Sequence, residues 1–233
     1  MVQILLEFGA DINKQNGLGN TALYLAAEND NLALVEFLVN YNVKEKGAKI
    51  DLGVTKGDND CVTPIMIATI KGHTEIVRFL MQEDANLTKR DEKDHTILHL
   101  AAMNNRHEVL ALLAAKNEEL VAELANRPNH EENTALHLAT QAGHLETVRE
   151  LLKVVNQDDV DNKNWDEQTP SHLAAAKGHS EVLGLLLQND PNSIFDKDEE
   201  DDTPLHLAAK NKQSSTVKTL LAAGKLIVNE QQS

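Results

Sequence analysis

The chain has 233 residues, of which 41% are hydrophobic and only 3% aromatic, and its formal net charge at pH 7 is −15. Residues 117–202 hold 20 acidic and 6 basic side chains, a net charge of −14, whereas all other residues together hold 17 and 16, a net charge of −1. This balance argues against binding to nucleic acid or to an anionic membrane surface, since both need a basic face. It favours basic partners, or it serves only to keep the chain soluble.

Targeting signals and disulfides are also missing from the sequence. No apolar run approaches the roughly 18 residues that a membrane span requires, and residue 1 leads into a repeat without a signal-peptide pattern. The single cysteine, Cys61, cannot form a disulfide within the chain. We therefore expect a soluble, cytoplasmic protein with no direct membrane contact.

One phrase recurs along the sequence, with copies such as TALYLAA, TALHLAT and TPLHLAA. Its threonine stands at positions 21, 63, 96, 134, 169 and 203, so the intervals are 42, 33, 38, 35 and 34 residues. A period near 33 residues is typical of a stacked helical solenoid. The sequence thus predicts one array over residues 1–233, divided at about 1–15 (a partial repeat), 16–57, 58–90, 91–128, 129–163, 164–197 and 198–233.

Two of these intervals are long. Thr21 to Thr63 carries about nine extra residues, which we place in a solvated insertion loop over about 40–60. Thr96 to Thr134 carries five extra residues, for which we expect a lengthened second helix.

Each repeat reads as two short helices. Counted from the threonine, apolar residues at positions 2, 4, 5 and 6 mark a first helix, and those at 13, 14, 17 and 18 mark a second. The threonine is a natural N-cap, and the proline that follows it in three copies is tolerated in a first helical turn. Glycine at position 9, as in Gly72, Gly143 and Gly178, permits a positive φ where the first helix ends.

These residues resemble the ankyrin repeat: the phrase TPLHLAA at 203–209, then GHSEVLGLLL at 178–187, and GADIN at 9–13. The resemblance covers residues 2–224, with residues 2–8 similar to the second helix of an incomplete copy. It implies an all-α solenoid of antiparallel helix pairs with projecting hairpin loops, here called fingers. The glycine expected two residues before the threonine is present only as Gly19. At the other fingers Cys61, Asp94, Glu132, Glu167 and Asp201 replace it, and a left-handed backbone is costlier for them.

The sequence gives no sign of catalysis, a cofactor or a metal. His99, His137, His172 and His206 occur once per layer, and layers about 8 to 10 Å apart cannot bring single histidines onto one zinc ion. The resemblance implies instead that they bond to neighbouring threonines and backbone. The acidic run 196–202 lacks the glycine and glutamate of a calcium loop, and no catalytic motif is present. Cys61 is either an exposed, reactive thiol or a small residue filling a turn.

The resemblance also implies where partners bind: at the fingertips and at positions 7 and 8 on the first helix. The acidic fingers surround Trp165, the one tryptophan, and tryptophan is enriched at interface hot spots. We predict that this surface binds a basic peptide, with an arginine or lysine stacked on the indole. Alternatively, Trp165 packs onto its own finger and the acids only keep the array soluble. The predicted residues are Glu131, Glu132, Trp165, Asp166, Glu167, Lys177, Glu199, Glu200 and Asp202.

The sequence favours a non-catalytic protein-interaction scaffold or adaptor. Because the chain begins in mid-repeat, two alternatives stay open. It is the cytoplasmic ankyrin segment of a larger protein, such as a cation channel of the transient receptor potential type, or a regulatory module fused to an enzyme. Function is grafted onto folds, and the repeats alone do not choose.

Overall fold

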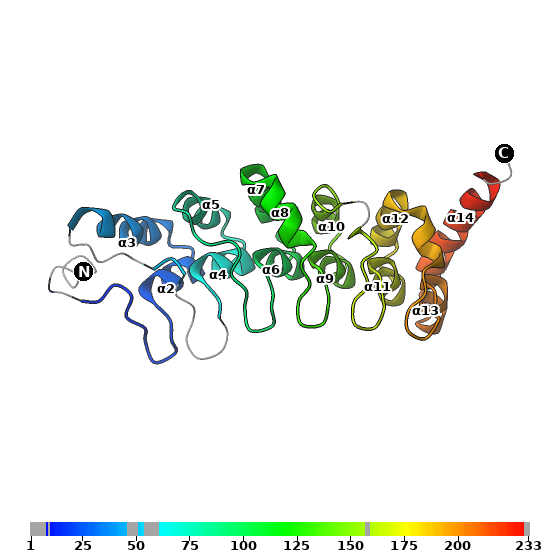
Figure 1. The fold of residues 1–233 in the computed structure, drawn as a ribbon, viewed down its shortest axis with the longest axis horizontal. Helices are drawn as coiled ribbons and strands as arrows, with labels where there is room; N and C mark the ends of the chain where they lie inside the picture. The colour runs from blue at the N-terminus through cyan, green and yellow to red at the C-terminus, as the bar shows by residue number, and fades with distance from the viewer. Residues whose placement is uncertain (1–7, 9, 46–50, 54–60, 157–158, 231–233) are drawn as a thin grey trace.

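The structure is a computed structural model that describes residues 8, 10–45, 51–53, 61–156 and 159–230. All regular elements in this part of the chain are helices, which lie in two rows, and hairpin fingers project along one edge (Figure 1). The first helices of the layers are α2 (Ala22–Glu28), α4 (Pro64–Lys71), α6 (Ile97–Met103), α9 (Ala135–Ala142), α11 (Pro170–Lys177) and α13 (Pro204–Lys210). The second row holds α3 (Leu32–Glu45), α5 (Thr74–Gln82), α7 (His107–Lys116), α8 (Glu118–Ala125), α10 (Leu145–Leu151), α12 (Ser180–Asn189), the 3-10 helix η2 (Pro191–Phe195) and α14 (Ser214–Glu230). The predicted helical solenoid is confirmed.

Each first helix begins after the recurring threonine. The backbone of these threonines is extended, with φ between −87° and −80°, and the Thr21 hydroxyl accepts a hydrogen bond from the Tyr24 N–H at 3.1 Å. Pro64, Pro170 and Pro204 occupy the first helical turn. All six threonines thus occupy the predicted N-cap position, and the side-chain cap hydrogen bond is present at Thr21, Thr63 and Thr134.

Each first helix is followed by a left-handed residue nine positions after the threonine. Three of these residues are the glycines predicted for the turn, with φ between 74° and 83°. The other three carry side chains and still take φ between 55° and 59°, which costs about 1 kcal/mol each relative to glycine. They are Asp30, Asn105 and Lys212.

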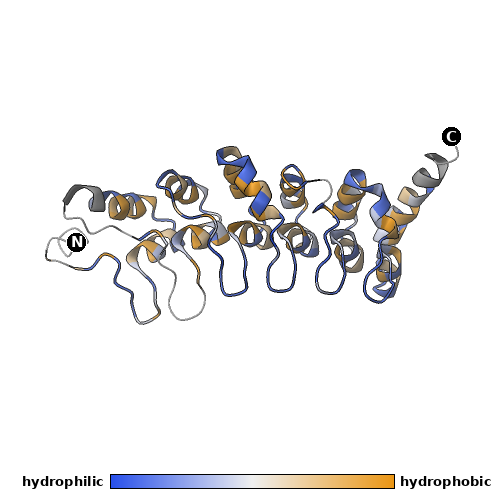
Figure 2. Cartoon of the chain, in the orientation of Figure 1, coloured by the Kyte–Doolittle hydropathy of each residue, from blue (hydrophilic) through white to orange (hydrophobic). Residues whose placement is uncertain are grey.

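The apolar positions of both helices form one continuous core. Leu23, Ile65, Leu98 and Leu136 are buried at the same position of successive layers. Figure 2 shows hydrophobic residues concentrated in the helices and hydrophilic residues along the fingers. Since the core runs through every layer, the helices fix the fingers in a common orientation.

A threonine and a histidine join successive layers. In His99, Nδ1 accepts a hydrogen bond from the Thr96 N–H at 3.1 Å, and Nε2 donates to the carbonyl of Asn133, in the next finger, at 2.9 Å. His137 and His172 repeat this pattern, donating to the carbonyls of Gln168 and Asp202 at 3.1 Å. The bonding predicted for these histidines is confirmed.

These hydrogen bonds require a neutral imidazole, with the proton on Nε2. Desolvation by burial lowers the pKa of His99 and His137 to about 4, and it lowers the pKa of His172 as well. The histidines thus act as uncharged interlayer connectors.

A second set of hydrogen bonds joins the layers on the other side of the first helices. In each case a side chain in one layer, ten residues after that layer's threonine, contacts a backbone carbonyl in the preceding layer. That carbonyl lies seven residues after the threonine of the preceding layer. His73 contacts the Glu28 carbonyl at 3.1 Å, and Arg106 Nε donates to the Ile70 carbonyl at 3.0 Å. The later contacts are His144 with Met103, His179 with Gln141 and Gln213 with Ala176.

The two long intervals differ from expectation. The lengthened second helix predicted in the 91–128 repeat is wrong, because the chain breaks at Asn117 into α7 and α8. Asn117 is extended, and its side chain caps α8 by accepting a hydrogen bond from the Leu120 N–H at 3.0 Å. The predicted loop 40–60 begins later than expected, since α3 runs to Glu45; residues 46–50 and 54–60 of this prediction lie outside the described residues.

Acid should weaken the fold through the neutral histidines. The pKa of a histidine is near 6.5 in the unfolded chain but about 4 for the buried His137 in the folded chain. The contribution of this histidine to folding stability is therefore complete above pH 6.5 and is lost as the pH falls toward 4. At pH 5 each such histidine should lower the free energy of unfolding by about 2 kcal/mol relative to pH 8. Urea titrations at pH 8 and pH 5 measure this change.

The matched comparison is His137→Gln. Its stability is lower at pH 8, but its loss between pH 8 and pH 5 should be smaller than that of the wild type by about 2 kcal/mol. Burial raises the pKa of Asp161 and Asp196, which stabilises the fold toward acid, but both proteins share these carboxyls. Identical pH profiles would contradict a neutral, buried His137.

A second prediction concerns the left-handed residues that lie nine positions after each threonine. Lys212→Gly should raise the free energy of unfolding by about 1 kcal/mol, because glycine takes a positive φ without cost. Gly143→Ala should lower it, since a Cβ there would lie 2.6 Å from Cε1 of His179. Thermal denaturation followed by circular dichroism checks both signs, and a destabilised Lys212→Gly protein contradicts the account.

Candidate protein-binding surface

The fingers are five-residue hairpins that share one hydrogen-bond pattern. In the finger 164–168 the Asn164 N–H donates to the Gln168 carbonyl at 3.1 Å, and the Asn164 side chain accepts from the N–H groups of Asp166 and Gln168. The same closure holds fingers 16–20, 91–95, 129–133 and 198–202, each of which begins with asparagine or aspartate. An Asx residue at this position thus replaces flexible loop backbone with a fixed turn.

The fingers keep this conformation without glycine. Cys61, Asp94, Glu132, Glu167 and Asp201 all have positive φ, between 49° and 61°, at the position that Gly19 occupies in the first finger. The hydrogen bonds that close each finger hold this turn, and they offset the local cost noted from the sequence. Cys61 is exposed there.

Successive fingers also bond to one another. The N–H groups of His130, Trp165 and Glu199 each donate to a carbonyl of the preceding finger, at 3.1, 3.2 and 3.4 Å. The acceptors are Lys93, Glu131 and Asp166. Successive fingers therefore stand side by side, and we call the tips of fingers 91–95, 129–133, 164–168 and 198–202 the finger row.

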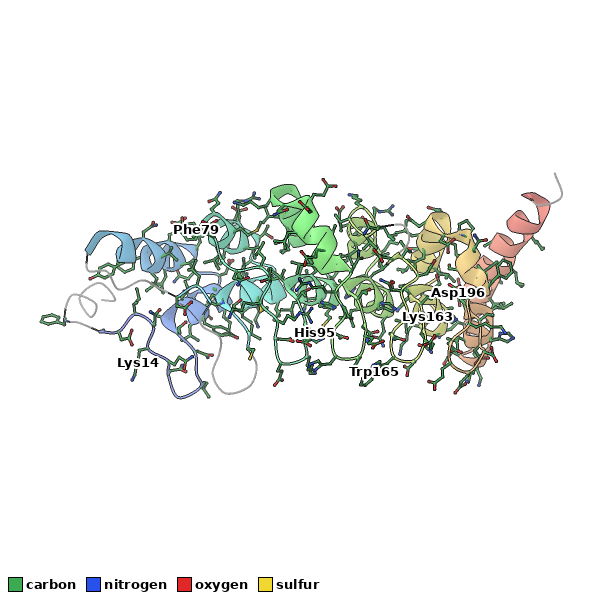
Figure 3. All side chains as sticks on the ribbon, viewed as in Figure 1. Lys14, Phe79, His95, Lys163, Trp165 and Asp196 are labelled. Carbon is green, nitrogen blue, oxygen red and sulfur yellow. The ribbon has the colours of Figure 1, made fainter. Side chains whose placement is uncertain are left out.

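Trp165 lies exposed in the finger row. Its side chain is 69% exposed, so it does not pack down onto its own finger, and Figure 3 shows it at the free edge of the array. An indole left in water at a fixed position contributes nothing to the core. Its exposure is the strongest indication of a binding role.

Four carboxylates around Trp165 have no cationic partner among the described residues: Glu131, Glu132, Asp166 and Glu199. The flanking acids are partly neutralised within the chain. Lys163 Nζ lies 3.0 Å from Glu167, and Lys210 Nζ lies 2.8 Å from Glu200 and 3.4 Å from Asp202. The structure therefore concentrates the unpaired negative charge beside the indole.

Lys177 stands apart from these groups. It is exposed at the end of α11, on the first-helix face, and no described hydrogen bond or ion pair joins it to the finger carboxylates. The structure thus brings together eight of the nine predicted residues on the fingers and leaves Lys177 on a neighbouring face.

Sequence reasoning missed the two lysines that pair with the flanking acids, and also a group of acids beneath the fingers. Burial, a hydrogen bond with Asp190 and the charges of Asp190 and Asp196 raise the pKa of Asp161 to about 8. The spacing of Lys163 and Glu167, four residues apart, was a usable signal for the first pair. Lys210 and Asp161 are distant in sequence from the residues they contact, and no recognisable motif links them.

The described residues contain no group of three histidine, cysteine, aspartate or glutamate side chains placed to hold a metal ion. Among the helices described here, none has the length and apolar character needed to cross a membrane.

Comparison with known proteins agrees with this architecture. A family model described as ankyrin repeats, three copies, matches in five overlapping placements: residues 1–91, 47–123, 85–161, 111–193 and 154–231. Rabankyrin-5 of Mus musculus is 30% identical over 152 residues, which cover 65% of this chain and 12% of that protein. Protein fem-1 homolog A-like of Mus musculus is 34% identical over 83 residues, or 36% of this chain and 11% of that protein.

A shorter match reaches the leucine-rich repeat serine/threonine-protein kinase 1 of Caenorhabditis elegans, 36% identical over 90 residues, which cover 39% of this chain and 4% of the kinase. The chain thus spans about an eighth or less of these relatives, and what it shares with them is the repeat. The family match extends over nearly the whole sequence and agrees with the layered helices and fingers. The chain belongs to the ankyrin-repeat family.

Proposed function

We propose that this chain is a non-catalytic protein-interaction module, acting in the cytoplasm, whose finger row binds a basic, extended segment of a partner protein. Ankyrin repeats in general mediate protein–protein interaction. The observation that carries the finer proposal is the 69% exposed Trp165 among unpaired carboxylates. An arginine or lysine over the indole gains from the ring and from the surrounding negative charge at once.

The spacing of the fingers defines the partner further. Layers of packed helices stand about 8 to 10 Å apart, and an extended chain rises about 3.3 Å per residue. A partner whose cations recur at every third position therefore places one cation at each successive finger. Polyproline II geometry, with three residues per turn, presents all of these cations on one side.

Lys177, on the neighbouring first-helix face, has a different role. As an exposed cation on the first-helix face, it repels a basic segment that strays from the fingers. It thus confines the partner to the finger row.

A second candidate function rests on one of the relatives. The match to a protein whose name describes it as a kinase favours a regulatory module fused to an enzyme. In that case the finger row binds a basic segment of the same polypeptide, and the recognition chemistry is unchanged.

Two peptides of identical composition test the spacing, one with arginine at every third position and one with the arginines clustered. Fluorescence anisotropy at about 0.15 M salt should give roughly tenfold tighter binding for the spaced peptide, because it reaches more fingers without bending. Equal affinities would remove the spacing from the proposal.

Substitutions test the residues. Trp165→Ala should weaken binding of the spaced peptide about tenfold, and Asp166→Lys should weaken it and reduce its dependence on salt. Lys177→Ala should leave the affinity unchanged or raise it. The matched control is Glu181→Lys, which changes an exposed acid on α12, away from the fingers. If Glu181→Lys weakens binding as much as Asp166→Lys, net charge alone drives binding and the site is wrong.

A further inference from the structure

A cationic residue stands directly before three of the four fingers in the finger row, and it pairs with the fourth residue of its own finger. The pairs are Arg90 with Asp94 at 3.6 Å, Lys163 with Glu167 at 3.0 Å, and Lys197 with Asp201 at 3.2 Å. The acidic member of each pair is the residue with positive φ. The pairing is therefore a repeated feature of the fingers.

Two of these cations also contact the next layer. Arg90 Nη1 donates to the carbonyl of Pro128, the residue directly before the next finger, at 3.5 Å. Lys163 Nζ donates to the carbonyl of Lys197, at the same position of the layer that follows it, at 2.8 Å. The cation before a finger thus lies between two acceptors, the carboxylate of its own finger and a backbone carbonyl of the following layer.

Finger 129–133 departs from this pattern. The residue before it is Pro128, which carries neither a charge nor a side-chain donor. Its fourth residue, Glu132, is exposed and has a φ of 57°, as its equivalents do, but its carboxylate has no cationic or hydrogen-bonding partner among the described residues.

The second acceptor of this layer is also unpaired. The Lys163 carbonyl stands where the carbonyls of Pro128 and Lys197 accept from the preceding layer, and it accepts no hydrogen bond within the described part of the chain. Between fingers 129–133 and 164–168 there are thus two acceptors without the cation that joins them elsewhere. We call the Glu132 carboxylate and the Lys163 carbonyl the socket.

The cations closest to the socket in the sequence are engaged elsewhere. Arg127 pairs with Glu123 of α8, and His130 Nε2 lies 3.1 Å from Asp94 of the preceding finger. The ammonium group of Lys163 pairs with its own finger. These contacts hold the neighbouring cations away from the socket.

The socket belongs to the same pair of fingers as Trp165. The Trp165 N–H donates to the Glu131 carbonyl at 3.2 Å, next to Glu132. Figure 3 shows Lys163 closer to the helices and Trp165 toward the free edge of the fingers. A basic segment that lies against Trp165 is therefore within one finger of the socket.

We propose that the socket receives a cationic side chain of the partner, in the place that Arg90 and Lys163 occupy in the layers on either side. This inference rests on the proposed function and gives it an anchor point, at which Glu132 supplies the charge and Lys163 a carbonyl. Finger 129–133 is closed by the same hydrogen bonds as its neighbours, so it needs no rearrangement to accept the cation. Pro128 is then the residue that leaves the place open.

Replacing Pro128 by lysine tests the socket, because the chain then supplies the missing cation itself. Pro128 is exposed, so the variant should fold, as circular dichroism can verify. Pro128→Lys should bind the spaced arginine peptide about tenfold more weakly than the wild type. Unchanged affinity of Pro128→Lys overturns the proposal.

Two control variants accompany Pro128→Lys. Pro128→Ala removes the proline without adding a charge and should bind as the wild type does. Ala111→Lys adds the same charge to the exposed surface of α7 and should weaken binding less than about twofold. A loss in Ala111→Lys equal to that in Pro128→Lys contradicts a local site.

Glu132→Gln removes the other half of the contact while keeping the size of the side chain. It should weaken peptide binding about fivefold. In the Glu132→Gln protein, adding Pro128→Lys should weaken binding further by no more than about twofold, because both substitutions act on one contact. Losses that simply multiply would contradict the socket.

A measurement without peptide separates this inference from the proposed function. The pKa of the new lysine, followed by carbon-13 NMR, should be higher in Pro128→Lys than in the double variant with Glu132→Gln, because the carboxylate favours the charged ammonium. Equal values overturn the socket whether or not a peptide binds. A wild type that binds no basic peptide contradicts the proposed function and this inference together, whereas Trp165-dependent binding that Pro128→Lys leaves unchanged contradicts the socket alone.

Discussion

The contacts between successive layers at His99, His137 and His172 depend on an imidazole that must stay neutral. The imidazole between a threonine N–H and the carbonyl of the next finger works only as the neutral Nε2–H form, because Nδ1 accepts while Nε2 donates. Burial supplies that form by making the charged ring costly in a dry interlayer space. Each of these three histidines thus fixes the position of the finger that follows it, and replacing one of them would affect the next layer.

Rigid fingers separate structural residues from functional ones. The Asx residue at the start of each finger and the left-handed residue near its end hold the backbone, and the tip-to-tip hydrogen bonds align successive fingers. The side chains between them are free to vary without affecting the helices. In the C-terminal half this freedom is used for acids and one indole, and Lys163 and Lys210 neutralise the edges of that surface but not its centre. The result is a local negative site on a protein that is acidic in general.

Much of the fold could be predicted from the sequence, because the same residue types recur at the same positions in successive repeats. The threonine caps, the histidines and the buried leucines follow from position in the repeat alone. Where one copy departs from the others, the sequence was a weaker guide. Asn117 followed by two glutamates is an N-cap signature, and it divides the expected long helix into α7 and α8. The left-handed Glu132 and Glu167 go against local preference, and the hydrogen bonds of their N–H groups to the Asn129 and Asn164 carbonyls, within the same finger, hold them there. The exposure of Trp165 likewise depends on neighbours 34 residues away on either side, and the pairing of Lys210 with Glu200 depends on how α13 meets its finger.

The most direct test of the neutral histidine ladder is nitrogen-15 NMR of the imidazole rings of the full chain at pH 6, where an unburied histidine is largely protonated. Two-bond correlations distinguish the protonated ring from its two neutral tautomers. The account predicts that His99, His137 and His172 all show the neutral form with the proton on Nε2. Protonated rings, or a proton on Nδ1, would contradict it, because the hydrogen bonds that set the fingers could not then form as described.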